Sequence, residues 1–503
     1  MNIQQAKQQI KNAITAYRTR DEYGRPVIPQ HRQRPVFLLG APGIGKTAIM
    51  EQIAQELGIP LVSYSMTHHT RQSALGLPYI VEREYNGKQF RVSEYTMSEI
   101  IAAVYEKSKQ TGIQEGILFL DEINCVSETL APAMLQFLQY KVFGQHRVPE
   151  GWIVVTAGNP PEYNQSVREF DMVTWDRLKR IDVTPDYDVW RGWAINHGAH
   201  QAVLSYLDIC RADFYQVEST VDGKSFVTPR GWIDLSDMLK LYEQHELPVS
   251  EQLMGQYLQN AQISKSFANY YDLWMKYRSD YQIDSILSGK PGKVIKQRAT
   301  DAKFDERITL IGLLLDAILS EVSHVMRERD LLQAILPVLR AIRVESSNKH
   351  FDALAALDKH LDEQKQRLDQ GVEGNMLSQE NENTLRGLIV FLQDAQTSLH
   401  GKSGDTDIFS VLKGMFDMRM DQLKETALLT GQRLENLFAF AEKVFGDGQE
   451  MLIIVTELTA ANDAARFIAQ YGSTAYFRHN KELLFYERQI ETIREIDNLD
   501  LEL

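Results

Sequence analysis

The sequence predicts an α/β fold in which a parallel sheet lies between helices, followed by a helical lid and a mostly α-helical C-terminal region. Short apolar segments alternate with helical segments up to about residue 185, which is the pattern of a parallel sheet covered on both faces. A glycine-rich loop stands directly between one such apolar segment and a helix-forming segment. Beyond about residue 300 the apolar residues recur mainly at helical spacing.

The expected strands of the sheet are short apolar segments, each followed by turn residues or a polar segment. Fully apolar strands with helical connections are typical of a sheet whose two faces are both buried. The segments are residues 36–40 (VFLLG), 61–65 (LVSYS), 117–122 (ILFLDE), 152–159 (WIVVTAGN) and 180–183 (RIDV). Two hairpins are expected to interrupt the alternation, at residues 79–95, where Asn86 and Gly87 favour a tight turn, and at residues 141–151.

Composition limits the class of protein. The 503 residues are enough for about three domains of ordinary size. Hydrophobic residues make up 44% and charged residues 24%, which excludes a disordered or fibrous chain. Acidic residues outnumber basic ones by 68 to 54, and the formal charge of −14 makes nucleic acid an unlikely general partner.

Localisation is predicted from what the chain lacks. Its two cysteines are too few for a disulfide framework, and its first residues have no apolar segment of the signal-peptide type. The longest apolar segment of note, residues 308–315, is shorter than the about 20 residues that span a bilayer. We therefore expect a cytoplasmic protein without a membrane span.

A phosphate-binding loop occupies residues 40–47. Its residues are Gly40, Ala41, Pro42, Gly43, Ile44, Gly45, Lys46 and Thr47. Glycines let backbone N–H groups curl around phosphate oxygens, and the N-terminus of the following helix adds its positive end. Lys46 is expected to reach the β- and γ-phosphates, and Thr47 to bind Mg²⁺. The loop therefore predicts a nucleoside triphosphate site.

Polar side chains end two further predicted strands. Asp121 and Glu122 follow four apolar residues, so Asp121 is expected to hold Mg²⁺ and Glu122 to polarise the attacking water. Asn159 ends the predicted strand at 152–159, where its amide is expected to orient that water or to contact the γ-phosphate. Strands that run into solvated turns would give the same local patterns, but the order of the motifs favours one nucleotide site.

Arginines occur at two later positions that suit a nucleotide. Arg177 precedes the last predicted strand, where it is expected to reach the nucleotide of an adjacent subunit and stabilise transition-state charge. Arg180 is an alternative for the same role. Arg230 follows a proline at the start of a helix and is expected to bring a lid cation to the γ-phosphate.

Taken in this order, the motifs resemble those of AAA+ ATPases of the MoxR-like branch. The resemblance covers about residues 20–290, and the last part of the chain carries no motif with assigned chemistry. The segments that carry it are GAPGIGKT (40–47), LFLDEIN (118–124), TAGNP (156–160), DRL (176–178) and TPRGW (228–232). The usual form of the DRL box in the family is DRF, so Leu178 departs from the pattern beside Arg177.

The resemblance implies roles, a substrate and partners. By analogy Asn159 is sensor 1, Arg177 is the trans-acting arginine finger, Arg230 is the sensor 2 arginine, and the nucleotide is ATP with Mg²⁺. The two hairpins are similar in position to insertions that face the pore of a ring in this branch. Members typically form hexamers, act with von Willebrand A-type partners, and remodel or mature other protein complexes.

The predicted domains follow from these assignments. Residues 1–185 are expected to form the AAA+ nucleotide-binding core, with an N-terminal helix and the two hairpins. Residues 186–288 are expected to form the helical lid, and residues 289–300, rich in Gly, Pro and Lys, a linker. Residues 301–503 are expected to form a helical C-terminal domain.

Two other classes of function stay open at this point. A nucleic-acid motor or restriction-type NTPase can be built on the same core, and so can a scaffold that binds nucleotide with little turnover. The acidic balance disfavours the first, and the complete set of phosphate and carboxylate motifs disfavours the second. Residues 348–352 (NKHFD) resemble a guanine-specificity box only superficially and are expected to be solvated helix surface.

Overall fold

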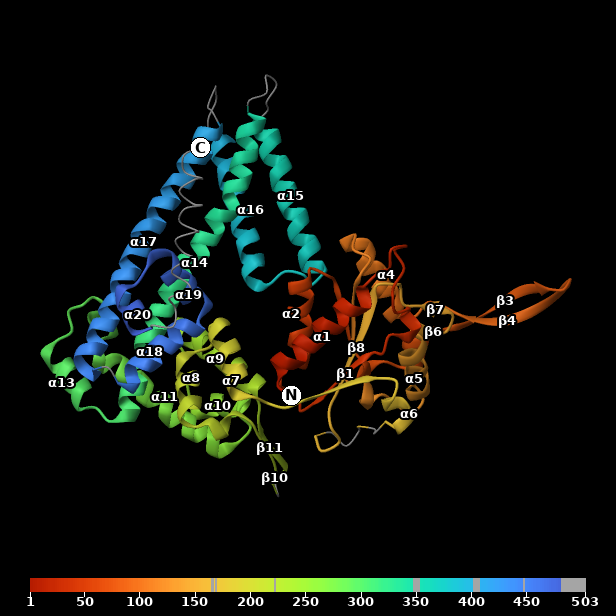
Figure 1. Ribbon diagram of the computed structural model, residues 1–503, viewed down its shortest axis with the longest axis horizontal. Coiled ribbons are helices and arrows are strands. Elements are labelled where there is room, and N and C mark those ends of the chain that lie inside the picture. The colour runs from red at the N-terminus through yellow and green to blue at the C-terminus, as the bar shows by residue number, and fades with distance from the viewer. Residues whose placement is uncertain are drawn as a thin grey trace. The chain divides into compact units, whose positions relative to one another are not determined.

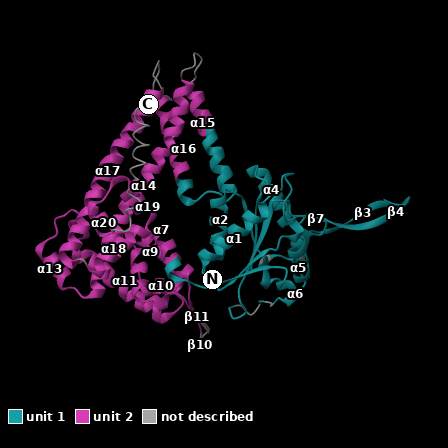
Figure 2. Cartoon of the chain, viewed as in Figure 1, with its two compact units in different colours: residues 1–189, 362–383 teal, residues 190–361, 384–503 magenta. Residues whose placement is uncertain are grey.

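The computed structural model describes residues 1–163, 167, 170–220, 223–346, 353–400, 408–446 and 448–480 (Figure 1). The chain divides into two compact units (Figure 2). Unit 1 comprises Met1–Val189 and Asp362–Asn383, and unit 2 comprises Trp190–Leu361 and Thr384–Leu503. A short segment from the C-terminal half of the chain is therefore part of unit 1. The NKHFD segment at 348–352 lies outside the described residues.

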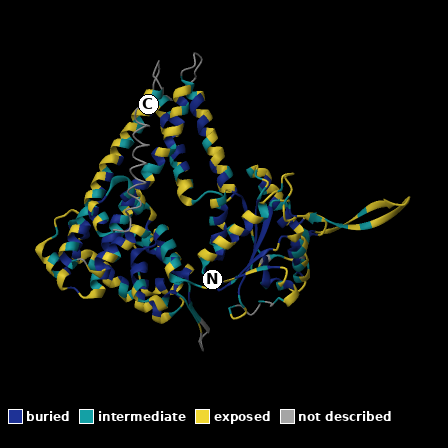
Figure 3. Cartoon of the chain, viewed as in Figure 1, coloured by how far each residue is buried: buried dark blue, intermediate teal, exposed yellow. Residues whose placement is uncertain are grey.

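Unit 1 is built around a parallel sheet with the strand order β2-β5-β8-β1-β9. The strands are β1 (Val36–Gly40), β2 (Leu61–Ser65), β5 (Gly116–Asp121), β8 (Trp152–Gly158) and β9 (Lys179–Val183). The central strand β8 is buried along its whole length (Figure 3). The apolar character of these strands follows from helices that flank the sheet. The predicted α/β class, a parallel sheet between helices with a mostly helical C-terminal region, is confirmed.

The helices of unit 1 carry apolar residues on the side that meets the sheet. In α1, the Asn2 side chain caps the helix by accepting from the backbone N–H of Gln5, and the Gln5 side chain accepts from the backbone N–H of Asn2. Ala6, Ile10 and Ile14 form the buried face. The helices are α1 (Ile3–Arg18), α2 (Lys46–Leu57), α3 (Arg71–Leu75), α4 (Glu99–Thr111), α5 (Ala131–Tyr140) and α6 (Met172–Trp175).

Hairpins form at both positions where the sequence predicts them. Strands β3 (Pro78–Tyr85) and β4 (Lys88–Tyr95) pair antiparallel around Asn86 and Gly87, both of which have positive φ. This hairpin is largely exposed and projects from the rest of unit 1 (Figures 1 and 3). The second hairpin pairs β6 (Val142–Phe143) with β7 (His146–Arg147).

Unit 2 is mainly helical and joins the predicted lid to the predicted C-terminal region in one core. Its largest buried side chains include Trp232, Phe267 and Trp274, with Trp232 and Phe267 edge to face at 5.3 Å. A Cβ added at Gly312 would lie 3.0 Å from the Trp274 ring, so the C-terminal region packs directly on a lid residue. The lid also contains a hairpin, β10 (Gln216–Thr220) with β11 (Gly223–Val227), which the sequence analysis did not predict.

The helices of unit 2 extend from the lid to the end of the described chain. Those of the lid are α7 (Tyr187–Asn196), which begins in unit 1, α8 (Gln201–Ile209), α9 (Pro229–Gln244), α10 (Glu251–Tyr257), α11 (Ala261–Tyr281) and α12 (Ile283–Leu287). Those that follow are α13 (Lys293–Asp301), α14 (Phe304–Glu345), α15 (Ala353–Glu373), α16 (Gln379–His400), α17 (Ile408–Phe445), α18 (Gln449–Ala460), α19 (Asn462–Tyr471) and α20 (Thr474–His479). Helices α15 and α16 each contribute residues to both units.

The predicted linker at 289–300 is mostly helix. Helix α13 occupies Lys293–Asp301, and only the Gly289–Gly292 part stays irregular. Ile295 and Ala299, one turn apart, are buried, so tertiary packing favours the helix. The Gly and Pro residues end the preceding helix rather than separate two domains.

Helix α14 contains the apolar segment at residues 308–315 and continues well beyond it. It contains a segment that by length and composition is able to cross a membrane, with a mean hydropathy of 1.7. Of that window, 61% is buried inside the protein, which is the pattern of a core helix. The acidic residue Asp316 interrupts the run, and Pro337 lies inside the helix.

Lys141 is an unusual buried cation at the end of α5. Its side chain is 3% exposed, and its Nζ donates to the Leu138 carbonyl at 2.6 Å. Burial lowers the pKa of Lys141 from 10.5 to about 8, because the charged form loses its hydration. The folded protein therefore binds fewer protons than the unfolded chain between about pH 8 and 10.5, and stability from this group rises with pH across that window.

We expect Lys141→Met to raise the free energy of unfolding of unit 1 by about 1–2 kcal/mol at pH 7, because it removes the burial of a charge. The gain should fall toward zero as the pH rises above about 10.5, where the wild-type lysine is neutral in both the folded and the unfolded state. Calorimetric melting at the two pH values measures this, with the exposed Lys109→Met as the control. An equal gain at both pH values would contradict the assignment.

Candidate functional site

The candidate site lies at the carboxyl edge of the parallel sheet in unit 1. Strands β1, β5 and β8 are adjacent and run in the same direction, with Leu39 opposite Gly158 and Leu120 opposite Thr156. Each strand therefore delivers its following residues to the same edge. This register brings together the phosphate-binding loop, the two carboxylates after β5 and Asn159, as the sequence predicts.

The loop of residues 40–47 joins β1 to α2. Gly45 has φ 91°, a conformation that other residues rarely adopt, and α2 begins at the next residue. Ala41 and Ile44 are buried, which fixes the loop against the sheet. The loop is thus built at a helix N-terminus, where backbone N–H groups and the helix dipole favour an anion.

Lys46 is held by three oxygen atoms of this edge. Its Nζ donates to the carbonyls of Gly40 and Ala41, each at 2.8 Å, and to Asn159 Oδ1 at 2.9 Å. The side chain is 7% exposed, so these acceptors replace the water that a buried ammonium needs. The bond to Asn159 joins the phosphate-binding loop directly to the end of β8.

Thr47 and Asp121 form the oxygen pair that fits a divalent cation. Thr47 Oγ1 donates to Asp121 Oδ2 at 2.9 Å, and Asp121 Oδ1 accepts from the backbone N–H of Glu122 at 2.9 Å. Mg²⁺ prefers such oxygen ligands and keeps several waters, so one hydroxyl and one carboxylate are a sufficient protein contribution. Among the described residues, no group of three or more His, Cys, Asp and Glu offers another metal site.

Glu122 has a strained backbone conformation, and its carboxylate accepts hydrogen bonds from two hydroxyl groups. Its φ is 54° and its ψ 35°, which a residue with a side chain adopts only at a cost. Its Oε2 accepts from Ser65 Oγ at 3.1 Å and from Thr67 Oγ1 at 3.2 Å. Ser65 is the last residue of β2, the strand next to β5, and Thr67 lies two residues beyond it. The sequence analysis missed them, because a hydroxyl at a strand end has no signature until the strand order is known.

Asn124 is a second residue that the sequence analysis did not single out. It is 4% exposed, and its Nδ2 donates to the backbone carbonyl of Asn159 at 2.8 Å. A Cβ at Gly158 would lie 2.3 Å from Asn124 Oδ1, so glycine is required there for this close approach. The segment after β5 thereby fixes the segment after β8. Its position in the LFLDEIN motif was the available signal.

The structure separates Arg177 and Arg180 from this edge within one subunit. Arg180 lies opposite Phe37, about 10 Å along the strand from Gly40, and Arg177 precedes it. Arg180 is paired with Asp182 at 2.7 Å and lies 4.7 Å from the Trp175 ring centre. Arg177 is exposed.

Arg230 belongs to unit 2, whereas the loop and the carboxylates belong to unit 1. It occupies the first turn of α9 behind Pro229, and Thr228 caps that helix by accepting from the N–H of Gly231 at 3.2 Å. Its side chain is exposed. Its predicted role at the γ-phosphate stays a prediction.

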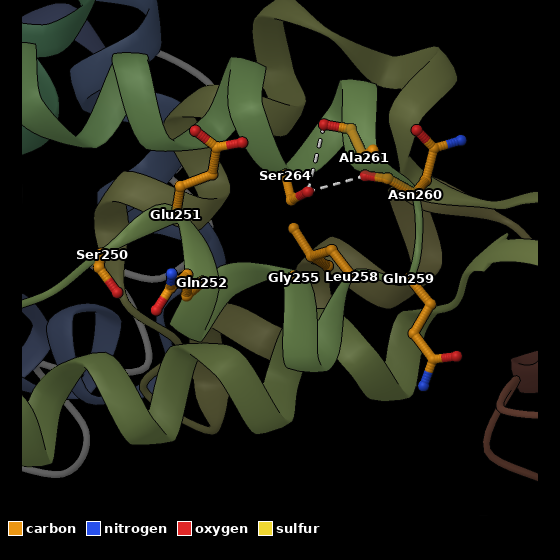
Figure 4. Close-up of a pocket in the computed structure, with 9 residues that line it drawn as sticks. All are labelled: Ser250, Glu251, Gln252, Gly255, Leu258, Gln259, Asn260, Ala261 and Ser264. Atoms are coloured by element: carbon orange, nitrogen blue, oxygen red, sulfur yellow. Dashed lines mark hydrogen bonds between the residues drawn. The ribbon is translucent and has the colours of Figure 1, made fainter.

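A separate pocket of about 740 Å³ lies in unit 2 (Figure 4). It is lined by residues of α10, the following connection and the start of α11, and Figure 4 shows the Ser264 hydroxyl turned back to the carbonyls of Asn260 and Ala261. The pocket contains none of the predicted site residues. This pocket is therefore separate from the predicted nucleotide site.

Comparison with known proteins identifies the segment that carries this edge. Residues 35–178 match the sequence profile of the AAA domain of the dynein-related subfamily. The chain carries an AAA+ ATPase domain. The match begins just before β1 and ends at Leu178, so the AAA+ domain includes Lys46, Glu122 and Arg177. Domains of this family bind and hydrolyse ATP.

Other comparisons add little to this assignment. No curated protein sequence matches the chain significantly. Among solved structures, a crystal structure of NtrX from Brucella abortus is similar at 17% sequence identity, with a TM-score of 0.23. The similarity covers 40% of this chain and 40% of that one. The motifs and their geometry in the AAA+ domain therefore carry the functional argument.

We expect Asn124→Ala to lower ATP turnover by about ten-fold while the protein still binds ATP, because the Asn159 carbonyl loses its partner and the sensor segment shifts. Loss of a buried hydrogen bond should also cost about 1–3 kcal/mol of stability. Steady-state hydrolysis and nucleotide titration measure the two effects separately. The exposed Glu128→Ala is a control on the same connection. Unchanged turnover in the Asn124 variant would exclude the positioning role.

Proposed function

We propose that this chain is an ATP-hydrolysing AAA+ protein of the MoxR-like type, which assembles into a ring and remodels or matures protein complexes. The observation that supports hydrolysis best is the convergence of Lys46, Thr47, Asp121, Glu122 and Asn159 at one sheet edge. The ring, the hexameric state and the protein client rest on the resemblance of the sequence motifs to that branch.

Each residue at the carboxyl edge of the sheet has its own proposed role in ATP hydrolysis. The backbone of residues 41–46 and the ammonium of Lys46 hold the β- and γ-phosphates, after Lys46 exchanges its present carbonyl acceptors for phosphate oxygens. Thr47 and Asp121 would hold Mg²⁺, which would neutralise charge on the phosphates. Glu122 accepts a proton from the attacking water, and Asn159 orients that water.

Two hydrogen bonds restrain the carboxylate of Glu122 in this structure. Its carboxylate accepts hydrogen bonds from Ser65 and Thr67, which compete with any water molecule for the same oxygen. Release of Glu122 from these hydroxyls would free Oε2 to accept a proton from the attacking water. A change of this kind gives a ring a means to couple hydrolysis to the state of a neighbour or client.

In the proposed ring, an arginine of the adjacent subunit lies at the γ-phosphate. Arg180 lies opposite Phe37, away from the phosphate edge of its own sheet, and Arg177 precedes it, which supports a role for an arginine of this box on an adjacent subunit. Arg177 suits that role better, because Arg180 is engaged by Asp182 and Trp175. Arg230 is proposed to add a lid cation. The proposed assembly is a homo-oligomer, and a hexamer by family analogy.

The client-binding part is proposed to include the β3–β4 hairpin. Its exposed apolar residues, such as Ile80 at 73% and Phe90 at 49%, suit contact with a protein surface. A cytoplasmic location and a von Willebrand A-type partner are further parts of the proposal that rest on the resemblance. The alternative of a nucleic-acid motor is tested by asking whether DNA stimulates hydrolysis.

We expect Lys46→Ala to weaken ATP binding at least about 100-fold, since the phosphates lose their buried cation. Glu122→Gln should bind ATP normally and lose at least about 100-fold in turnover, because the amide cannot accept the proton. For both variants, nucleotide titration measures ATP affinity and phosphate release measures turnover, each with and without Mg²⁺. Glu122→Gln with near-normal turnover would remove that residue from the chemical step.

We expect Arg177→Ala to leave ATP affinity nearly intact and to lower hydrolysis by about 10³-fold, while Arg180→Ala has a small effect. Mixing the Arg177→Ala protein with the Lys46→Ala protein should restore turnover, because each supplies what the other lacks. Turnover per subunit of the wild type should also rise steeply with protein concentration. Normal turnover of Arg177→Ala would move the role to Arg180, and a concentration-independent rate would argue against sites shared between subunits.

A further inference from the structure

The turn between α15 and α16 contacts the edge of the AAA+ sheet. It lies in residues 362–383, the segment from the C-terminal half that belongs to unit 1 (Figure 2). The Gly374 carbonyl accepts from the backbone N–H of Leu61 at 3.2 Å. The neighbouring Glu373 carbonyl accepts from Nζ of Lys107. Two successive carbonyls of the turn are thus bound by β2 and α4.

The turn has a fixed local shape. The N–H of Gly374 donates to the Gln370 carbonyl at 2.9 Å, and Asn375 has φ 54°, so α15 ends in a left-handed residue. A Cβ on Gly374 would lie 2.7 Å from Met376 Cε and 3.0 Å from the Gln370 carbonyl oxygen. Gly374 is buried. A side chain at this position therefore changes the turn that presents the two carbonyls.

The contact with Leu61 satisfies an exposed edge. Strand β2 is the terminal strand of the sheet and pairs only with β5. The Pro60 carbonyl accepts from Ile117 on β5 at 2.9 Å, so the N–H of Leu61, on the opposite side of the same peptide plane, points away from the sheet. Such an unpaired edge group needs an acceptor, and Gly374 provides it.

The same strand ends at the hydroxyls that hold the catalytic carboxylate. Ser65 is opposite Asp121 in the register of β2 and β5, and Ser65 and Thr67 donate to Glu122. A terminal strand has one neighbour and is the strand of a sheet most able to shift its position. Movement of β2 against β5 would move these hydroxyls relative to Glu122. One short strand thus connects the turn to the catalytic group.

We propose that the α15–α16 turn is a docking element through which the C-terminal helices regulate ATP hydrolysis. While docked on Leu61 and Lys107, it keeps β2 in the position in which Ser65 and Thr67 bind Glu122. Release of the turn loosens β2, frees Glu122 and raises turnover. The proposal rests on the proposed ATPase function and assigns a role to a region without motifs of its own.

The first test is Lys107→Ala in the full chain, with the exposed Lys109→Ala on the same helix as the matched control. Amide hydrogen exchange should become faster at Leu61, since Gly374 no longer stays in place. ATP turnover should rise at least about ten-fold, since the loss of one hydrogen bond to a charged group is worth at least that factor, and ATP affinity should not change. Lys109→Ala should match the wild type in both measurements.

Two further variants decide whether β2 carries the effect. Gly374→Val, which disturbs the turn itself, should reproduce both the faster exchange and the higher turnover. In a Ser65→Ala/Thr67→Val background, Lys107→Ala should speed exchange but add nothing to turnover. An additional gain in that background would show that the hydroxyls do not mediate the effect.

The remaining outcomes separate this proposal from the proposed function. Unchanged exchange at Leu61 in both Lys107→Ala and Gly374→Val would overturn the docking contact. Faster exchange at Leu61 with unchanged or lower turnover would overturn the regulatory role, and the α15–α16 turn would then only stabilise β2. A wild-type chain without any ATP hydrolysis would instead contradict the proposed function, whereas exchange at Leu61 would still test the docking.

Discussion

The parallel register of β1, β5 and β8 is the constraint on which the nucleotide site depends. Because the three strands are adjacent and run in one direction, their following residues meet at a single edge. Lys46 links two of these segments by its bond to Asn159 Oδ1. A buried ammonium without such acceptors would be strongly unfavourable, so the position of the loop and that of Asn159 depend on each other.

Hydrogen bonds connect the polar groups at the carboxyl edge of the sheet. Thr47 contacts Asp121, Asp121 accepts from the N–H of Glu122, and Asn124 donates to the carbonyl of Asn159. The positive φ of Glu122 is maintained within that network. Backbone strain of this kind persists only where the surroundings determine the conformation, and it occurs often at functional sites. The hydroxyls of β2 then set the direction of the Glu122 carboxylate.

Unit 2 shows how a helical region without recognisable motifs is integrated with the lid. Arg191 of α7 is bound by Asp208 of α8 at 2.8 Å and by Glu457 of α18. Burial raises the pKa of Glu457, and the Arg191 guanidinium opposes that shift. A charge pair so buried costs stability when either partner is removed. The lid and the C-terminal helices are therefore expected to respond together to forces on either one.

The sequence by itself determined the class of fold, the strand segments, the hairpins and the residue types of the AAA+ site, because these depend on local patterns. Periodicity and glycine spacing are properties of neighbouring residues. The residues Ser65, Thr67 and Asn124 were not predicted, since their roles require the strand order and two close approaches between distant segments. The helical state of residues 293–301 and the contact of Gly374 with Leu61 also depended on tertiary packing. Long-range contacts decide these features because hydrogen bonds and burial, not local propensity, select the final geometry.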